Sequence, residues 1–135
     1  MKRRTRQFAL EVIRAVETLP RDRIGDVLGR QLLRCGTSVG ANYRSATRAR
    51  SAADFVAKMG LAEEEADASG YWLDLLEATG RLTPAAASTL AREAGELTAI
   101  AIASIRTARR TAAASKPDET RRIAPRSAFR APRYP

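Results

Sequence analysis

The stretch that decides the fold is LGRQLLRCGTSVGANYRSATRARSAADF, residues 28–55. It starts inside one apolar helical pattern and ends at the beginning of the next. Between the two patterns lie a polar joint, from Ser38 to Asn42, and a basic connection that holds Arg44, Arg48 and Arg50. We expect the rest of the chain to pack onto these two helices.

Apolar residues recur at helical spacing in four segments of the sequence, at about residues 5–19, 23–45, 51–79 and 83–110. Three of the segments carry a start signal. Thr5 and Ser51 are good N-cap residues, and Thr83 precedes Pro84 at a first helical position. Because the links are short, neighbouring helices run antiparallel. We expect an all-α fold, an antiparallel up-and-down four-helix bundle that takes up residues 1–110.

Basic residues are concentrated at the two ends of the chain. The net charge is +9, and residues 1–7 hold four basic residues and no acid. Residues 111–135 hold six basic and two acidic residues among four prolines, a composition that predicts a disordered basic tail. Basic ends favour polyanionic partners such as nucleic acid. The simpler alternative is a pair of solvated ends that only aid solubility.

Gly36 and Gly40 are unusual inside a helical pattern, because a glycine costs about 1 kcal/mol against alanine in a helix interior. They either let another backbone approach closely or mark a distortion near the polar joint. Ser38 and Asn42 can hydrogen bond to backbone groups there. We expect the second helix to end between Gly40 and Arg48.

No set of residues in this sequence predicts catalysis. Cys35 is the only cysteine and the chain has no histidine, so a nucleophilic thiol would lack its usual base. Acidic residues cluster from Glu63 to Asp67, but carboxylate metal sites in helical bundles also use Glu-x-x-His pairs. We expect no enzymatic activity, no metal and no cofactor, and we interpret the acidic cluster as a solvated or salt-bridged face.

The sequence carries no recognisable targeting segment. The basic residues at the start are not followed by an apolar run of the signal-peptide type. No stretch approaches the roughly 20 apolar residues that a membrane-spanning helix needs. The default expectation is a cytoplasmic protein that does not enter a membrane.

The strongest candidate binding site is a group of four basic residues with Asp54 as the only acid among them: Arg44, Arg48, Arg50 and Lys58. Guanidinium groups at the end of a bundle suit bidentate binding of phosphate. The sequence therefore predicts a nucleic-acid-binding site here. The alternative is a solvated loop whose arginines pair with acids on a neighbouring element.

Arg34 is the candidate for a structural polar pair within the bundle. It lies four residues before Ser38, and Asn42 follows after another four residues, so the three share one helix face. Glu64 and Glu65 on the third helix are the candidate partners of the guanidinium group. A buried pair of this kind would fix the register of two helices more than it would add stability.

Two apolar residues lie off the main seams of their helices and are candidate interface residues. Trp72 follows Tyr71 beside a glycine, and large aromatic residues in such positions often anchor an interface. Ile100 lies outside the narrow apolar stripe of the last helix, which indicates either a wide core or a contact between subunits.

Four motifs together carry a family resemblance: QLLR at 31–34, SVGAN at 38–42, RARS at 48–51, and EEAD at 64–67 followed by YWL at 71–73. From Phe8 to about Arg109 the chain resembles the four-helix bundle proteins encoded in intervening sequences of bacterial 23S ribosomal RNA genes, also called S23 ribosomal proteins. The resemblance implies an antiparallel four-helix bundle without known enzymatic activity. Ala68 departs from the pattern, because similar sequences carry an acidic residue there.

Distant relatives of that family are the accessory variability proteins of diversity-generating retroelements. They resemble this fold, assemble as pentamers with a basic surface, and bind nucleic acid and a reverse transcriptase. What the resemblance implies for this chain is a homo-oligomer, a pentamer by analogy, that associates with RNA or DNA.

Residues and resemblance together predict a non-enzymatic, self-associating protein that binds the RNA or DNA backbone electrostatically. Arg44, Arg48, Arg50 and the basic ends would make the contacts, so binding would be salt-sensitive and weakly sequence-specific. The alternative is an adaptor without a direct nucleic-acid role, whose surface near Trp72 and Ile100 docks a protein partner.

Overall fold

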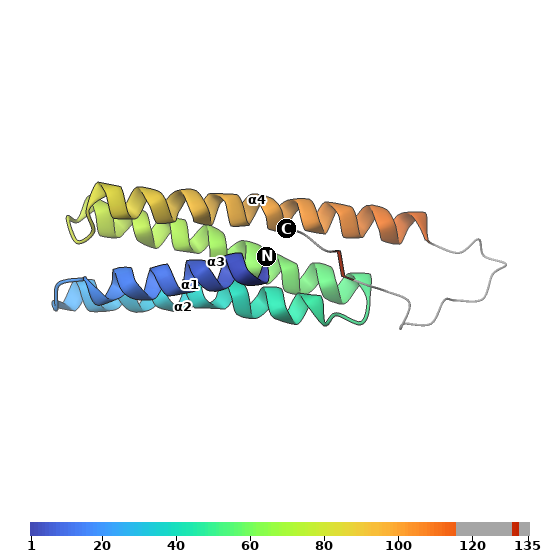
Figure 1. Ribbon diagram of the computed structural model, residues 1–135, viewed down its shortest axis with the longest axis horizontal. Helices are drawn as coiled ribbons and strands as arrows, with labels where there is room; N and C mark the ends of the chain where they lie inside the picture. The colour runs from blue at the N-terminus through green and yellow to red at the C-terminus, as the bar shows by residue number, and fades with distance from the viewer. Residues whose placement is uncertain (116–130, 133–135) are drawn as a thin grey trace.

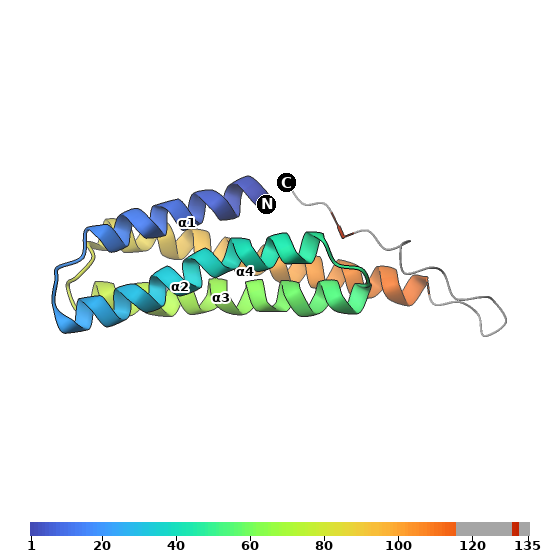
Figure 2. The same ribbon diagram turned by 90° about the horizontal axis from the view of Figure 1, so that it is seen from below.

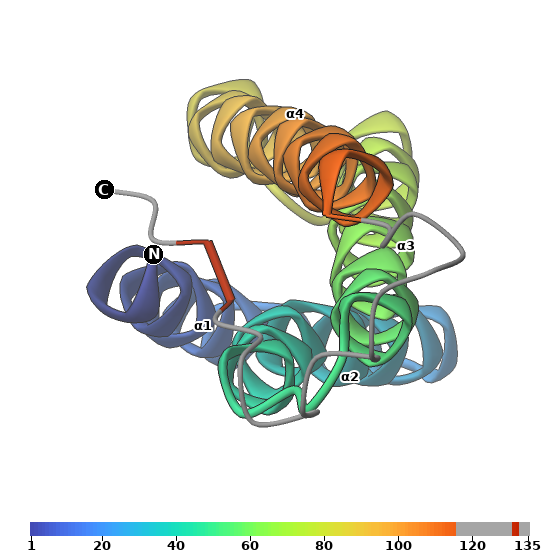
Figure 3. The ribbon, with the colours of Figure 1, turned by 90° about the vertical axis from the view of Figure 1, so that its right-hand side faces the viewer.

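The computed structural model describes residues 1–115 and 131–132 of the chain. This part of the chain forms four helices: α1 (Lys2–Glu17), α2 (Arg23–Thr47), α3 (Ala52–Ala78) and α4 (Pro84–Ala114). Consecutive helices run in opposite directions along one elongated bundle, as Figures 1 and 3 show. The prediction of an all-α four-helix bundle is confirmed.

The first helix begins earlier than the sequence indicated. We expected Thr5 to be its N-cap, but α1 starts at Lys2 with Met1 in the cap position and no side-chain cap. Thr5 is buried inside the helix, and its hydroxyl donates a hydrogen bond to the Met1 carbonyl at 2.9 Å. The threonine therefore serves packing rather than capping.

The last helix is longer than the sequence indicated. α4 continues to Ala114, so residues 111–114 belong to a helix and not to the basic tail in which we placed them. Three of these four residues are alanines, the best helix formers. The rest of the predicted tail, residues 116–130 and 133–135, lies outside the described residues.

The starts of α3 and α4 follow the capping signals in the sequence. The hydroxyl of Ser51 accepts a hydrogen bond from the Asp54 amide at 3.0 Å. The hydroxyl of Thr83 accepts one from the Ala86 amide at 3.2 Å, with Pro84 as the first helical residue. Each cap satisfies an amide that the first helical turn leaves without a partner.

The start of α2 contacts the link between α3 and α4. The Asp22 carboxylate caps α2 by accepting from the Gly25 amide at 2.6 Å, and Arg81 from the α3–α4 link donates to the same carboxylate at 3.2 Å. The Gly25 hydrogen bond and then Arg81 lower the pKa of Asp22. Asp22 thus joins two links that meet at one end of the molecule.

The predicted end of the second helix between Gly40 and Arg48 agrees with the structure, but no joint interrupts α2 at Ser38 to Asn42, so the polar joint is a wrong prediction. The helix runs unbroken to Thr47, and the side-chain amide of Asn42 donates to the Ser38 carbonyl at 2.9 Å within it. Polar residues at this place are accommodated inside the helix. The real connection to α3 is the short segment from Arg48 to Ser51.

Glycines of α2 let α1 approach closely, which is the first of the two interpretations given above. A Cβ at Gly36 would lie 2.9 Å from methyl carbons of Val12, and a Cβ at Gly40 would lie 3.3 Å from the hydroxyl of Thr5. A Cβ at Gly29 would lie 2.8 Å from a methyl carbon of Leu19, which follows the end of α1. This row sets the antiparallel register of α1 and α2.

The core is aliphatic with two phenylalanines, Phe8 and Phe55, both fully buried. Of the four helices α1 is the shortest, with 16 residues against 25 in α2. It covers only part of the length of α2 (Figure 2). Its contact with α4 is also the sparsest between neighbouring helices. The start of α1 therefore lies beside the later turns of α2.

None of the described helices is both long enough and apolar enough to cross a membrane.

Candidate nucleic-acid interface

The three predicted arginines lie together where α2 ends. Arg44 is in the last turn of α2, Arg48 is its C-cap residue, and Arg50 follows in the link to α3. All three side chains are exposed, and none takes part in an ion pair with a residue of the described chain. Their positive charge is therefore available to a ligand.

Lys58 differs from the three arginines. Its ammonium group lies 3.3 Å from the Asp54 carboxylate one turn earlier in α3. Both side chains are partly exposed, and such a pair within a helix contributes about 0.3–0.5 kcal/mol. Asp54 neutralises Lys58, so the lysine adds less to the positive surface than the sequence suggested.

The structure adds a basic groove that sequence reasoning missed. It lies between the start of α1 and the later turns of α2, has a volume of ≈ 610 Å³, and holds four basic residues: Lys2, Arg3, Arg6 and Arg44. In the sequence the basic N-terminus lies far from Arg44, and no local pattern predicts that they share a groove. The signal that joins them is the glycine row of α2, because an antiparallel helix packed on Gly40 places its first residues beside residue 44.

Acidic residues are absent from both segments that form this groove. No Asp or Glu precedes Glu11, and none lies between Asp26 and Asp54. Lys2, Arg3 and Arg6 are exposed and form no ion pair within the described chain. The groove is therefore positive throughout.

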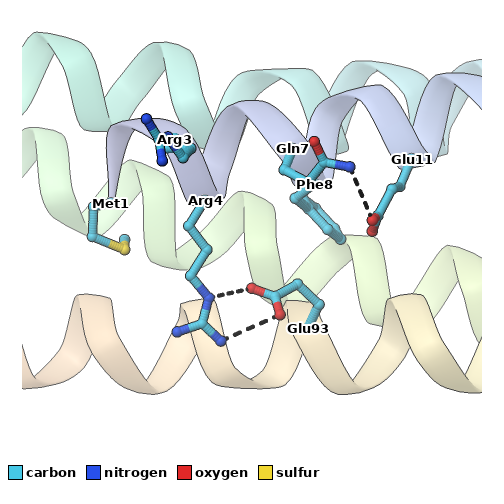
Figure 4. A pocket seen from close by; sticks show the side chains of 7 residues that line it. All are labelled: Met1, Arg3, Arg4, Gln7, Phe8, Glu11 and Glu93. Carbon is cyan, nitrogen blue, oxygen red and sulfur yellow. Dashed lines mark hydrogen bonds and ion pairs between the residues drawn. The ribbon is translucent and has the colours of Figure 1, made fainter. Parts of the chain in front are cut away.

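The opposite side of α1 shows the contrasting arrangement (Figure 4). Arg4 extends to α4, where its Nε donates to the Glu93 carboxylate at 2.5 Å and its Nη2 also contacts Glu96. The hydrogen bond to Glu93 is the main cause that raises the pKa of Arg4. Arg3, its neighbour in sequence, points away from this pair. One helix turn thus holds a neutralised arginine on one side and unpaired cations on the other.

The predicted polar pair forms with Glu65 and not with Glu64. A guanidinium nitrogen of Arg34 lies 3.4 Å from the Glu65 carboxylate. The Arg34 side chain is 58% exposed, so the pair is not a buried one. The Asn42 side-chain amide donates to the Ser38 carbonyl, and neither residue takes part in this pair.

Cys35 lies next to Arg34 and is fully buried. Its sulfur accepts a hydrogen bond from the Arg34 guanidinium at 3.4 Å. Burial, followed by the nearby Glu65 carboxylate, raises the pKa of the Cys35 thiol. The cysteine is a core residue with little thiolate at neutral pH.

Both predicted interface residues are partly buried. Trp72 and Ile100 pack against the core from its margin. Tyr71 stacks edge-on against Trp72, with ring centroids 5.1 Å apart, and is itself 58% exposed. Sequence reasoning missed the other exposed large apolar side chains: Ile24, Val27 and Leu61.

Metal ligands do not gather in the described chain. Within residues 1–115 and 131–132, no three His, Cys, Asp or Glu side chains form a group that could hold a metal ion. The residues Glu63 to Asp67 lie along successive turns of α3, and only Glu65 of them makes an ion pair in this part of the chain.

Comparisons with known proteins point to one family. The model of the 23S rRNA-intervening sequence protein family matches residues 1–103. A crystal structure of a protein with unknown function from the S23 ribosomal protein family of Bacteroides thetaiotaomicron VPI-5482 is similar, with a TM-score of 0.73 and 33% identity, over 78% of this chain and 97% of that one. No curated protein matches. The chain belongs to the 23S rRNA-intervening sequence protein family.

Proposed function

We propose that this protein is a non-enzymatic, cytoplasmic bundle that self-associates and binds the phosphate backbone of RNA or DNA. The observation that carries the proposal is a set of exposed arginines at the end of α2 that form no ion pair with the described residues: Arg44, Arg48 and Arg50. Arginine binds phosphate bidentately, and release of counterions from the nucleic acid drives such binding.

The charge at the start of α1 supports the proposal. A helix N-terminus carries a partial positive charge and is stabilised by acids, yet the first turn of α1 has no acid and begins with Lys2, Arg3 and Arg4. Arg4 finds acids on α4, but Lys2 and Arg3 do not. The chain tolerates a local electrostatic cost, which a bound polyanion would relieve.

Self-association is part of the proposal, with a pentamer as the expected state from the family resemblance. Large apolar side chains that the bundle leaves exposed support it: Ile24, Val27, Leu61 and Tyr71. In a closed ring the basic end of each subunit would repeat, and the fields of the repeated groups would add.

Two triple charge reversals that change the net charge of the protein by the same amount test the nucleic-acid proposal. The triple variant Arg44→Glu, Arg48→Glu, Arg50→Glu is compared with the control Arg14→Glu, Arg30→Glu, Arg92→Glu, whose arginines are also exposed and unpaired in the described chain. Anisotropy of a labelled single-stranded RNA is measured over a series of salt concentrations.

We expect the first variant to lose RNA binding at low salt and the control to keep most of it. For the native protein, each phosphate contact contributes about −0.7 to the slope of log affinity against log salt. Equal loss in both triple variants would contradict a localised site, since net charge alone would then explain the binding.

The second candidate function is a protein–protein adaptor, which the exposed apolar residues also favour. Size exclusion with light scattering separates the two, using Tyr71→Asp and the control Thr89→Asp, an exposed position on α4. A native oligomer that Tyr71→Asp dissociates supports self-association. A native monomer that ignores RNA at low salt favours the adaptor.

A further inference from the structure

The groove between α1 and α2 has the composition of a site for phosphate groups. Lys2, Arg3 and Arg6 line it from α1, and Arg44 lines it from α2. We infer that this groove binds consecutive phosphates of a linear phosphate chain and recognises nothing but the phosphates. The inference deepens the function proposed above and rests on it.

The spacing of the cations suits a chain of phosphates. Lys2 and Arg6 are four residues apart on one helix, and with a rise of 1.5 Å per residue they lie about 6 Å apart along α1. A chain of phosphates laid along the groove would therefore meet Lys2 and Arg6 in turn on the α1 wall, with Arg44 facing them from the other wall.

The floor of the groove offers little for reading bases or sugars. None of the nine described residues that line it is aromatic, so no ring is available there for stacking on a base. Its two hydroxyls are already engaged, because Thr5 donates to the Met1 carbonyl at 2.9 Å and Thr37 donates to the Leu33 carbonyl at 2.7 Å. Small residues, such as Gly40, make up the rest.

The other side of α1 provides an internal comparison. The second groove on this helix, of ≈ 450 Å³, is lined by Arg3 and Arg4 together with Glu11 and Glu93. The Glu93 carboxylate neutralises Arg4, and both carboxylates would repel a polyanion. Of these two grooves on α1, the α1–α2 groove combines several cations with no acid among the described lining residues.

Two ligands share the chemistry that the groove would recognise: the phosphodiester backbone of nucleic acid and inorganic polyphosphate. Because the groove has no means of reading a base, the two should compete for it. A ligand without any base is therefore the sharper probe of the site.

The experiment uses the full chain and a labelled 20-nucleotide RNA at low salt. Unlabelled inorganic polyphosphate of about 20 phosphates is titrated as competitor, and its direct binding is measured by calorimetry. Single reversals in the groove, Arg6→Glu and Arg44→Glu, are matched by reversals on the same two helices away from it, Arg14→Glu and Arg30→Glu. Circular dichroism checks that each variant stays helical, and Arg6→Gln and Arg44→Gln serve where a reversal perturbs folding.

We expect polyphosphate to displace the RNA completely, at a phosphate concentration within about tenfold of unlabelled RNA. Each charge reversal in the groove should lower the affinity for both ligands by the same factor, about ten or more. Each control reversal should lower it by less than about threefold. This difference is expected when a local phosphate contact is lost and not net charge alone.

The two proposals fail in different ways. If the native protein binds RNA but polyphosphate does not displace it, or if groove and control reversals behave alike, the groove inference is wrong while nucleic-acid binding stands. If the native protein binds neither ligand at low salt, both the groove inference and the proposed function are overturned.

Discussion

Gly36 of α2 lies directly against Val12 of α1, so closely that a Cβ at residue 36 would come within 2.9 Å of both methyl carbons of the valine. Val12 is fully buried. This contact holds the two helices at their separation, and with it the width of the basic groove further along α1.

The substitution Gly36→Ala should therefore destabilise the protein, although alanine is the better helix former. Overpacking in a buried helix contact costs about 1–3 kcal/mol, which exceeds the gain in helix propensity of about 1 kcal/mol. Gly95→Ala on α4 is the matched control, because a Cβ there meets nothing within 4 Å. That variant should gain stability. Urea unfolding measures both, and equal signs for the two variants would contradict the close contact.

Lys2→Glu should stabilise the folded protein while weakening its affinity for RNA. An acid in the first turn interacts favourably with the helix N-terminus, a gain of about 0.3–1 kcal/mol at low ionic strength. Arg14→Glu should destabilise the folded protein, because Arg14 lies in the last turn of α1, where a positive charge is favourable. Thermal unfolding at low and high salt tests this, and both differences should shrink as salt is added.

Asp22 should make the stability of the protein depend on acidic pH. Its pKa is lowered in the folded state by the Gly25 amide and by Arg81, so the unfolded chain binds the proton more tightly. The stabilisation is complete above the ordinary Asp pKa of about 3.9 and is lost as the pH falls through the lower folded value. Asp22→Asn keeps a capping side chain but cannot ionise.

The measurement for Asp22 compares the melting temperature of the native protein and of Asp22→Asn from neutral pH to about pH 2–3, below the ordinary Asp pKa. The advantage of the native protein at neutral pH should shrink in acid. A difference that stays constant over this range would show that the carboxylate is not stabilised by its partners.

Cys35 should report on the opening of the bundle. The thiol is buried and its pKa is raised, so it forms little thiolate and a thiol reagent at pH 8 should modify it slowly in the folded protein. Urea should speed the labelling to the rate of a free cysteine, and Gly36→Ala should speed it without urea. Fast labelling of the native protein would mean that α2 and α3 separate readily at Glu65.

Much of the fold could be predicted from the sequence because its signals are local. The caps at Ser51 and Thr83 and the repeated apolar residues define the starts and faces of α3 and α4. The prediction of a joint in α2 was wrong because the sequence does not distinguish a glycine that weakens a helix from one that lets a neighbouring helix approach. Only the position of Val12 opposite Gly36 distinguishes the two.

The candidate site was predicted in part for a similar reason. The arginines at the end of α2 are close in sequence, and their grouping was visible. The contribution of Lys2 and Arg6 depends on the register between α1 and α2, which no local pattern gives. The same holds for Arg34, whose choice of Glu65 over Glu64 depends on how α3 is rotated against α2.

The uneven placement of acids has a kinetic consequence. Residues 1–10, 27–53 and 97–115 contain no acid, and the last turns of α2 and α4 both lie toward the end of the bundle away from the α1–α2 link (Figure 1). A molecule charged in this way has a large dipole moment, so a distant polyanion turns it before the two touch. Association should then be fast and oriented, with the basic end arriving first, and added salt should slow arrival more than it hastens departure.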